Sequence, residues 1–166
     1  MKIEITHIGI QEVKLPERSL KDHPEKQVIQ IANSIQAFGF NDPIAIDEKG
    51  EIIEGVGRVM AAQKMGLQTI PVIKLSHLSP AQKKAYRIAH NKITLNTGFD
   101  LEALKLEFES LSQLDQSLFS FTGFEKIELD DLLKFPDLPE LGLELTESLK
   151  DTKTVTCPHC GGQVHV

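Results

Sequence analysis

The segment Gly55-Val56-Gly57-Arg58 has the residue types and spacing to bind an anion. A β-prone run ends before it at Glu54, and a helical pattern begins at Arg58, so the glycines lie in a predicted strand-to-helix turn. The start of a helix offers unpaired backbone N–H groups and a partial positive charge, and glycine lets a phosphate approach the backbone. Arg58 would add a fixed cation. We therefore predict a phosphate-binding pocket here.

Alternatives stay open both for the glycines of this segment and for Glu54 before it. Glycines at such a turn also permit tight backbone packing without any ligand. The spacing fits neither the dinucleotide-binding fingerprint nor the P-loop, because no third glycine and no Gly-Lys-Ser/Thr follow. Glu54 is either a general base or metal ligand, or a solvated carboxylate at the end of a strand.

A second candidate site is the C-terminal pair Cys157 and Cys160, which are the two cysteines of the chain. In a cytosolic protein a CxxC pair is more typical of a metal or redox site than of a structural disulfide. The pair suits Zn²⁺, with His165 as a third ligand in preference to His159, which sits inside the turn. The fourth ligand of a zinc knuckle would come from a distant His or another chain, and a shared site would make a homodimer. The alternatives are a redox dithiol and a turn without metal.

The densest positive stretch follows Pro80, where Lys83, Lys84 and Arg87 lie on overlapping faces of a predicted helix. These cations could contact the phosphates of DNA or of a nucleotide. A solvated helix face is the alternative that we favour, because charge runs of this kind are common. The 166-residue chain carries a formal charge of −6, which argues against strong non-specific DNA binding by the whole surface.

Hydrophobic spacing and capping residues predict the elements that must position these residues. Two β-prone runs, 43–46 and 51–54, flank turn-forming residues and predict a hairpin that leads into the glycine segment. Capping boxes are expected at Asp22 with Glu25 and at Ser79 with Gln82. The other predicted elements are strands at 2–6 and 69–75 and helices at 22–38, 58–65, 80–91, 100–111 and 125–133.

Three stretches, 39–44, 52–62 and 70–72, resemble in order and spacing the N-terminal domain of the ParB partition proteins. The resemblance is closer still to ParB-like domains of phage proteins and of bacterial DNA modification methylases, which also carry a stretch like residues 86–92. It implies an α/β (α+β) fold of the ParB/sulfiredoxin type, with a small mixed sheet and flanking helices. The domains would be 1–98 for this fold, 99–135 for a helical extension, 136–153 for an acidic linker and 154–166 for the CxxC tail.

The resemblance also implies roles for particular residues. Pro43 and Ile44 would line a base pocket, Gly55 and Arg58 would hold a triphosphate, and Asn91 would help to bind Mg²⁺. The chain departs from the partition proteins at Gly57 and Thr94, where they have arginines, and at His90, where they have a glutamate. No cysteine lies in the domain, so the sulfinic-acid reduction of sulfiredoxin is excluded. A third relative phosphorylates free serine and has an acidic residue where this chain has Glu54.

The leading functional hypothesis is a nucleotide-phosphate-binding protein of phage or bacterial DNA metabolism, with Glu54 and Arg58 as the catalytic candidates if it is an NTPase or DNase. The alternatives are a non-catalytic DNA- or protein-binding adaptor and a serine-type small-molecule kinase. We expect Mg²⁺ with a nucleoside triphosphate, and DNA contact through a partner protein. No apolar run approaches the roughly 18 residues that a membrane span needs, so we expect no membrane partner and a cytoplasmic location in a bacterium.

Overall fold

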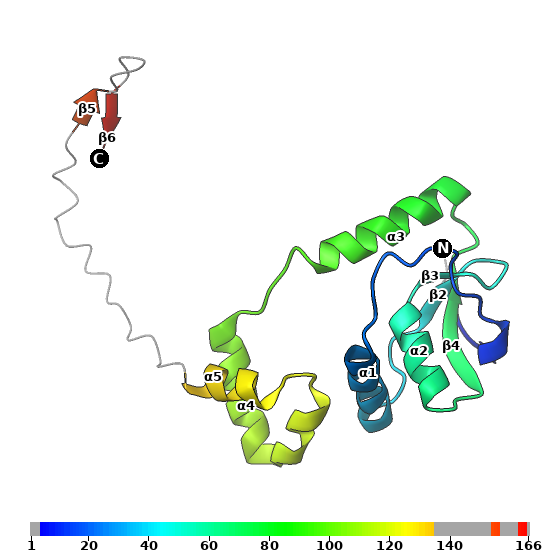
Figure 1. Ribbon diagram of the computed structural model, residues 1–166, viewed down its shortest axis with the longest axis horizontal. Helices are drawn as coiled ribbons and strands as arrows, with labels where there is room; N and C mark the ends of the chain where they lie inside the picture. The colour runs from blue at the N-terminus through cyan, green and yellow to red at the C-terminus, as the bar shows by residue number, and fades with distance from the viewer. Residues whose placement is uncertain (1–3, 135–153, 157–162, 166) are drawn as a thin grey trace. The chain divides into compact units, whose positions relative to one another are not determined.

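The computed structural model describes residues 4–134, 154–156 and 163–165, and the chain divides into two compact units, Met1–Lys134 and Phe135–Val166. The first unit contains four strands, five α-helices and two short 3₁₀ helices within its described residues (Figure 1). The strands are β1 (Ile5–Gly9), β2 (Ile44–Ile46), β3 (Ile52–Glu54) and β4 (Thr69–Lys74). The helices are η1 (Ile10–Glu12), α1 (Glu25–Phe38), α2 (Val56–Lys64), α3 (Pro80–Thr94), α4 (Leu101–Asp115), η2 (Gln116–Phe121) and α5 (Lys126–Lys134).

The sheet is small and mixed, with strand order β1-β4-β2-β3. The pairs β1–β4 and β2–β3 are antiparallel, whereas β2 and β4 run parallel. A hairpin joins β2 to β3, and α2 forms the crossover that returns the chain to β4. This arrangement confirms the predicted α/β fold with a small mixed sheet.

Successive side chains of a strand point to opposite faces of the sheet, and apolar side chains are buried on both faces. On one face Ile44, Ile46, Ile52 and Val72 pack with Val59 and Ala62 of α2. On the other face Ala45 and Ile53 pack with Leu75. Ala61 and Ala62 are fully buried, and their small side chains let α2 lie close to the sheet. The glycine segment between β3 and α2 is therefore held between two core elements.

The helix boundaries differ from the predicted ones where a cap was misassigned. Pro24 caps α1 without a side-chain hydrogen bond, so the capping box expected at Asp22 and Glu25 is wrong. The Glu25 carboxylate instead accepts a hydrogen bond of 2.8 Å from Lys64 Nζ, which joins α1 to α2. At α3 the predicted capping box is confirmed, with Ser79 N–H donating to Gln82 Oε1 at 2.9 Å. Strand β1 lies later than the predicted strand 2–6, whose first residues are outside the described part.

Helices α4 and α5 with η2 build a smaller core of their own. Phe108, Leu129 and Leu132 are buried in it, and Phe108 makes edge-to-face contacts with Phe119 and Phe124. Gln30 of α1 donates a hydrogen bond of 2.9 Å to the carbonyl of Gly123, which attaches this core to the first helix. The 3₁₀ helix η2 was not predicted.

In the second unit, β5 (Thr154–Thr156) and β6 (Gln163–His165) pair as antiparallel strands. Cys157 and Cys160 fall between them, outside the described residues, and so does the linker predicted at 136–153. The zinc prediction therefore stays a prediction. Within the described residues, no helix combines the length and the apolar character that a membrane crossing requires.

Candidate functional site

Gly55 makes the turn from β3 into α2. Its backbone has φ +106°, in the left-handed region that residues with a Cβ rarely adopt, and it is the N-cap of α2. A Cβ at this position would lie 2.7 Å from Cδ1 of Ile44 in the core beneath. Helix α2 therefore begins at Val56, two residues earlier than predicted, and its unpaired N–H groups follow the strand end directly.

Gly57 lies inside the first turn of α2 and is buried. A Cβ there would come within 3.1 Å of both the His23 imidazole and Cδ1 of Ile31 in α1. A hydrogen bond of 2.9 Å joins His23 Nδ1 to Gln27 Oε1, and it holds the imidazole in place. Gly57 therefore serves close packing of α1 on α2, whereas Gly55 serves the turn.

Arg58 is held by two carboxylates. Its Nη2 lies 2.6 Å from both Oε1 and Oε2 of Glu54, and its Nη1 forms an ion pair with Asp42. The side chains of Arg58 and Glu54 are only 18% and 19% exposed. Burial raises the pKa of the Glu54 carboxyl, an effect that electrostatic interaction with His90 and Lys21 opposes. Burial lowers the pKa of Arg58, but a guanidinium stays protonated at neutral pH.

A cavity of about 380 Å³ opens beside this ion pair. Its walls come from residues 16–23 before α1, from the glycine segment and from one face of α3. Among the lining residues the four basic side chains Arg18, Lys21, Arg58 and Arg87 face two carboxylates, Asp42 and Glu54, so the lining has a formal charge of +2. The whole chain has a charge of −6. The cavity is thus a local positive site in an acidic protein.

Helix α3 contributes Arg87, His90, Asn91 and Thr94 to the cavity, at spacings that place them on one helical face. The Asn91 side-chain amide donates to the Arg87 carbonyl at 2.8 Å, which leaves Asn91 Oδ1 for a ligand. Three buried side-chain nitrogens of the described residues have no hydrogen-bond partner, namely Arg58 Nε, Arg87 Nε and His90 Nδ1. All three belong to residues that line this cavity. Buried polar atoms without partners are rare, and here they mark a site with unused hydrogen-bonding capacity.

The structure brings together most, but not all, of the residues predicted for the site. Glu54, Gly55, Val56, Gly57, Arg58 and Asn91 all line the cavity. Pro43 and Ile44 are not among its described lining residues. Ile44 is fully buried and supports Gly55 from below.

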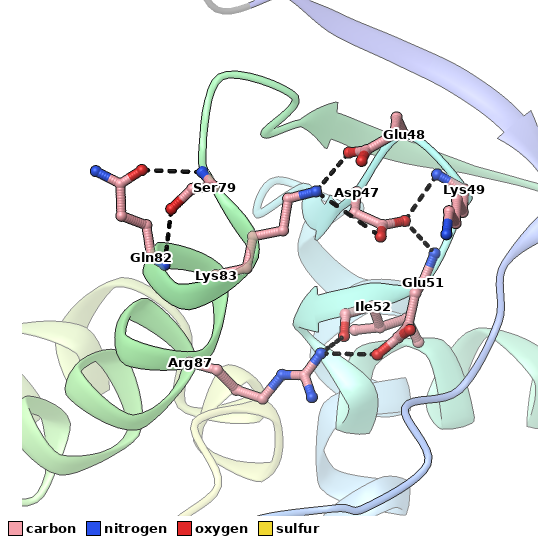
Figure 2. Close-up of polar contacts among 9 residues, drawn as sticks. All are labelled: Asp47, Glu48, Lys49, Glu51, Ile52, Ser79, Gln82, Lys83 and Arg87. Carbon is pink, nitrogen blue, oxygen red and sulfur yellow. Dashed lines mark hydrogen bonds and ion pairs between the residues drawn. The ribbon is translucent and has the colours of Figure 1, made fainter.

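Two of the three cations predicted to bind nucleic acid, Lys83 and Arg87, connect α3 to the β2–β3 hairpin (Figure 2). Lys83 Nζ lies 2.5 Å from Glu48 Oε2 and 3.9 Å from Asp47 Oδ2. Arg87 Nη2 donates to the carbonyl of Ile52 at 2.8 Å and to Glu51 Oε1 at 3.1 Å. Lys84 is exposed. Two of the three cations thus have structural partners within the described chain.

Sequence reasoning missed the wall formed by residues 16–23, which includes Arg18, Lys21 and His23. The available signal was the pair of cations, Arg18 and Lys21, that lies shortly before the helix predicted at 22–38. Their role depends on how α1 packs against α2, and sequence spacing does not report that packing.

Metal-ligating side chains are sparse in the part of the chain that the structure describes, which contains no group of three or more His, Cys, Asp or Glu suited to a metal ion. Mg²⁺ commonly takes only one or two protein ligands and completes its shell with phosphate oxygens and water. Glu54 and Asn91 line the same cavity and have the oxygen donors that Mg²⁺ prefers. They fit an Mg²⁺ ion that arrives with a nucleotide better than a metal held by protein ligands alone.

Comparison with known protein families identifies the family of the chain. The family model described as the ParB N-terminal domain matches residues 2–93. The chain therefore belongs to the ParB N-terminal domain family.

Two relatives are similar in sequence. The ParB-like nuclease domain-containing protein YnaK of Escherichia coli (strain K12) is 43% identical over 83 residues, which cover 50% of this chain and 95% of that protein. The uncharacterized protein ORF326b of Acidianus two-tailed virus is 31% identical over 141 residues, which cover 82% of this chain and 40% of the viral protein. The chain thus spans less than half of the viral relative.

One solved structure shares the fold over most of the chain. The C-terminally truncated chromosome-partitioning protein ParB from Caulobacter crescentus, complexed with CTP-gamma-S, has a TM-score of 0.65 at 18% identity, over 78% of this chain and 77% of that one. Sulfiredoxin from Arabidopsis thaliana has a TM-score of 0.40 at 25% identity, over 44% of this chain and 85% of that one. The assignment to the ParB N-terminal domain family that the motifs predicted is confirmed by the family model.

Proposed function

We propose that this protein binds a nucleotide through its phosphates in the cavity beside Gly55, and that it acts in DNA metabolism. One observation carries the proposal: the left-handed Gly55 opens α2 directly into a cavity whose lining has a formal charge of +2. Backbone N–H groups at a helix start bind phosphate oxygens, and the helix dipole favours their charge. The neighbour from Caulobacter crescentus, which shares the fold, is a chromosome-partitioning protein complexed with a CTP analogue.

Binding without catalysis is the form of this function that the Glu54–Arg58 contact favours. A general base must present a free lone pair to the proton that it removes. Both carboxylate oxygens of Glu54 already accept from Arg58 at 2.6 Å. Each oxygen keeps a second lone pair, so the contact does not exclude hydrolysis of a nucleotide, cleavage of DNA or phosphorylation of a small molecule, but it turns the carboxylate toward Arg58 and away from a substrate. The name of the Escherichia coli relative nevertheless contains "nuclease", so a nuclease is the second candidate function.

The test is a calorimetric titration of the wild-type protein with a panel of nucleoside triphosphates, with and without Mg²⁺. Binding should depend on Mg²⁺ if Asn91 and Glu54 place the ion, and Asn91→Ala should reduce that dependence. Turnover of nucleotide and of plasmid DNA is measured in the same samples. Binding without turnover supports the binding role, whereas turnover that Glu54→Gln removes would assign the catalytic one.

A further inference from the structure

The four basic side chains of the cavity are not equally available to a ligand. The Arg58 head is shared between Glu54 and Asp42. Arg87 uses Nη2 for the Ile52 carbonyl and for Glu51. A phosphate that approached either guanidinium would have to share it with a carboxylate. Much of the positive charge contributed by these two residues is therefore already balanced.

Arg18 and Lys21 are different. Neither forms an ion pair with another described residue, although both line the cavity. The Arg18 side chain is exposed and that of Lys21 is partly buried. The Ser19 hydroxyl donates to the Lys21 carbonyl at 2.5 Å and so stabilises the turn that carries both cations. Their charge is available to an anion in the cavity.

The segment that carries these cations is anchored next to the glycine turn. The His23 imidazole lies beside Gly57, where a Cβ would come within 3.1 Å of its Nδ1, and the same nitrogen forms a hydrogen bond of 2.9 Å with Gln27 Oε1 of α1. Lys21 lies only two residues before this anchor and is close enough to Glu54 to oppose the burial effect on its pKa. The backbone donors of α2 and the free cations of residues 18–21 therefore border the same space.

We propose that Arg18 and Lys21 contact the outer phosphates of a nucleoside triphosphate and give the cavity its preference for triphosphates over monophosphates. This inference rests on the proposed function, because it assigns a role within the same pocket. The unpaired backbone N–H groups at the start of α2 are few, and a single phosphate can occupy them. Each further phosphate adds negative charge that needs a cation, and these two residues have the available ones.

The experiment compares the wild-type protein with the double variant Arg18→Gln/Lys21→Gln. The matched control is Lys49→Gln/Lys74→Gln, which removes the same charge at exposed positions that do not line the cavity. Dissociation constants are measured at fixed ionic strength for CMP, CDP and CTP, and for phosphate, pyrophosphate and tripolyphosphate. The inorganic series contains no base, so it measures the effect of phosphate number on affinity whichever base the pocket prefers.

The wild type and the control should bind the triphosphates at least about tenfold more tightly than the monophosphates. The double variant should lose roughly ten- to a hundredfold in affinity for CTP and tripolyphosphate, and less than about threefold for CMP and phosphate. An equal loss along both series, or no loss for triphosphates, would overturn the inference while the proposed function stands. Absence of binding of every probe by the folded wild type would overturn both.

Discussion

Nη2 of Arg58 lies 2.6 Å from each carboxylate oxygen of Glu54, four residues earlier in the chain. The contact joins the end of β3 to the first turn of α2 across Gly55, so it fixes the turn as well as the charge of the cavity. Removing one member of a partly buried pair leaves an uncompensated charge, which costs more than the pair itself contributes. The two residues should therefore behave as a unit in ligand binding.

Arg58→Ala should weaken nucleotide binding by roughly ten- to a hundredfold, because it removes a charge-assisted donor and exposes the phosphate to an unbalanced Glu54. Arg58→Ala/Glu54→Gln should recover part of this loss, since the repelling carboxylate is then neutral. Calorimetry on folded variants measures both effects. Unchanged affinity in the single variant, or no recovery in the double one, would be inconsistent with this role.

Gly55→Ala should destabilise the fold more than Gly66→Ala. Both glycines have positive φ, so each alanine carries a backbone cost of about 1–2 kcal/mol. Only at Gly55 would the Cβ also meet a core atom, at 2.7 Å from Ile44 Cδ1, whereas nothing lies within 4 Å of a Cβ at Gly66. Urea denaturation gives both free energies of unfolding. Equal decreases in the free energy of unfolding would contradict this prediction, because they would mean that Ile44 moves to make room for the added methyl group at Gly55.

Lys83→Ala should reduce stability by up to about 1 kcal/mol, because Lys83 joins α3 to the β2–β3 turn. Lys84→Ala, next to it on the exposed surface, should leave stability unchanged. If this face also binds DNA, both variants should lower affinity and reduce the salt dependence of binding. Retention assays across salt concentrations test this. A stability loss from Lys83→Ala with no change in DNA affinity would limit this residue to its structural role.

The tail should bind Zn²⁺ through Cys157 and Cys160, with His165 as a third ligand or with ligands shared between two chains. Elemental analysis of chelator-free, reduced protein should then find at least about one zinc per two chains. The mass in solution before and after chelation separates a site within one chain from a site that joins two. Cys157→Ser/Cys160→Ser is the matched control. A lower metal content would leave a redox pair or a turn without metal.

Local signals in the sequence predicted the local structure well. The turn at 47–50 fixes the hairpin, and the capping box at Ser79 and Gln82 fixes the start of α3, because both depend on residues a few positions apart. The start of α2 was predicted two residues late. The pattern shows where apolar spacing begins at Val59, but not that a left-handed Gly55 lets the helix begin at once.

Long-range features of the site could not be predicted from the sequence. The position of His23 beside Gly57 depends on how α1 packs against α2, and Arg18 and Lys21 of the same segment line the cavity. The pairing of Arg87 with Glu51 connects residues that are 36 positions apart. The charge run on α3 therefore suggested a free basic face, although tertiary contacts had already engaged part of it.

Nucleotide binding in the cavity is tested most directly by titration of the wild-type protein with CTP and the other nucleoside triphosphates, with Mg²⁺, at fixed ionic strength. At least one triphosphate should show saturable binding that is tighter than that of the matching nucleoside and is weakened by Arg58→Ala. A folded wild-type protein that binds none of them with a dissociation constant below about 1 mM, some −4 kcal/mol, would contradict this prediction.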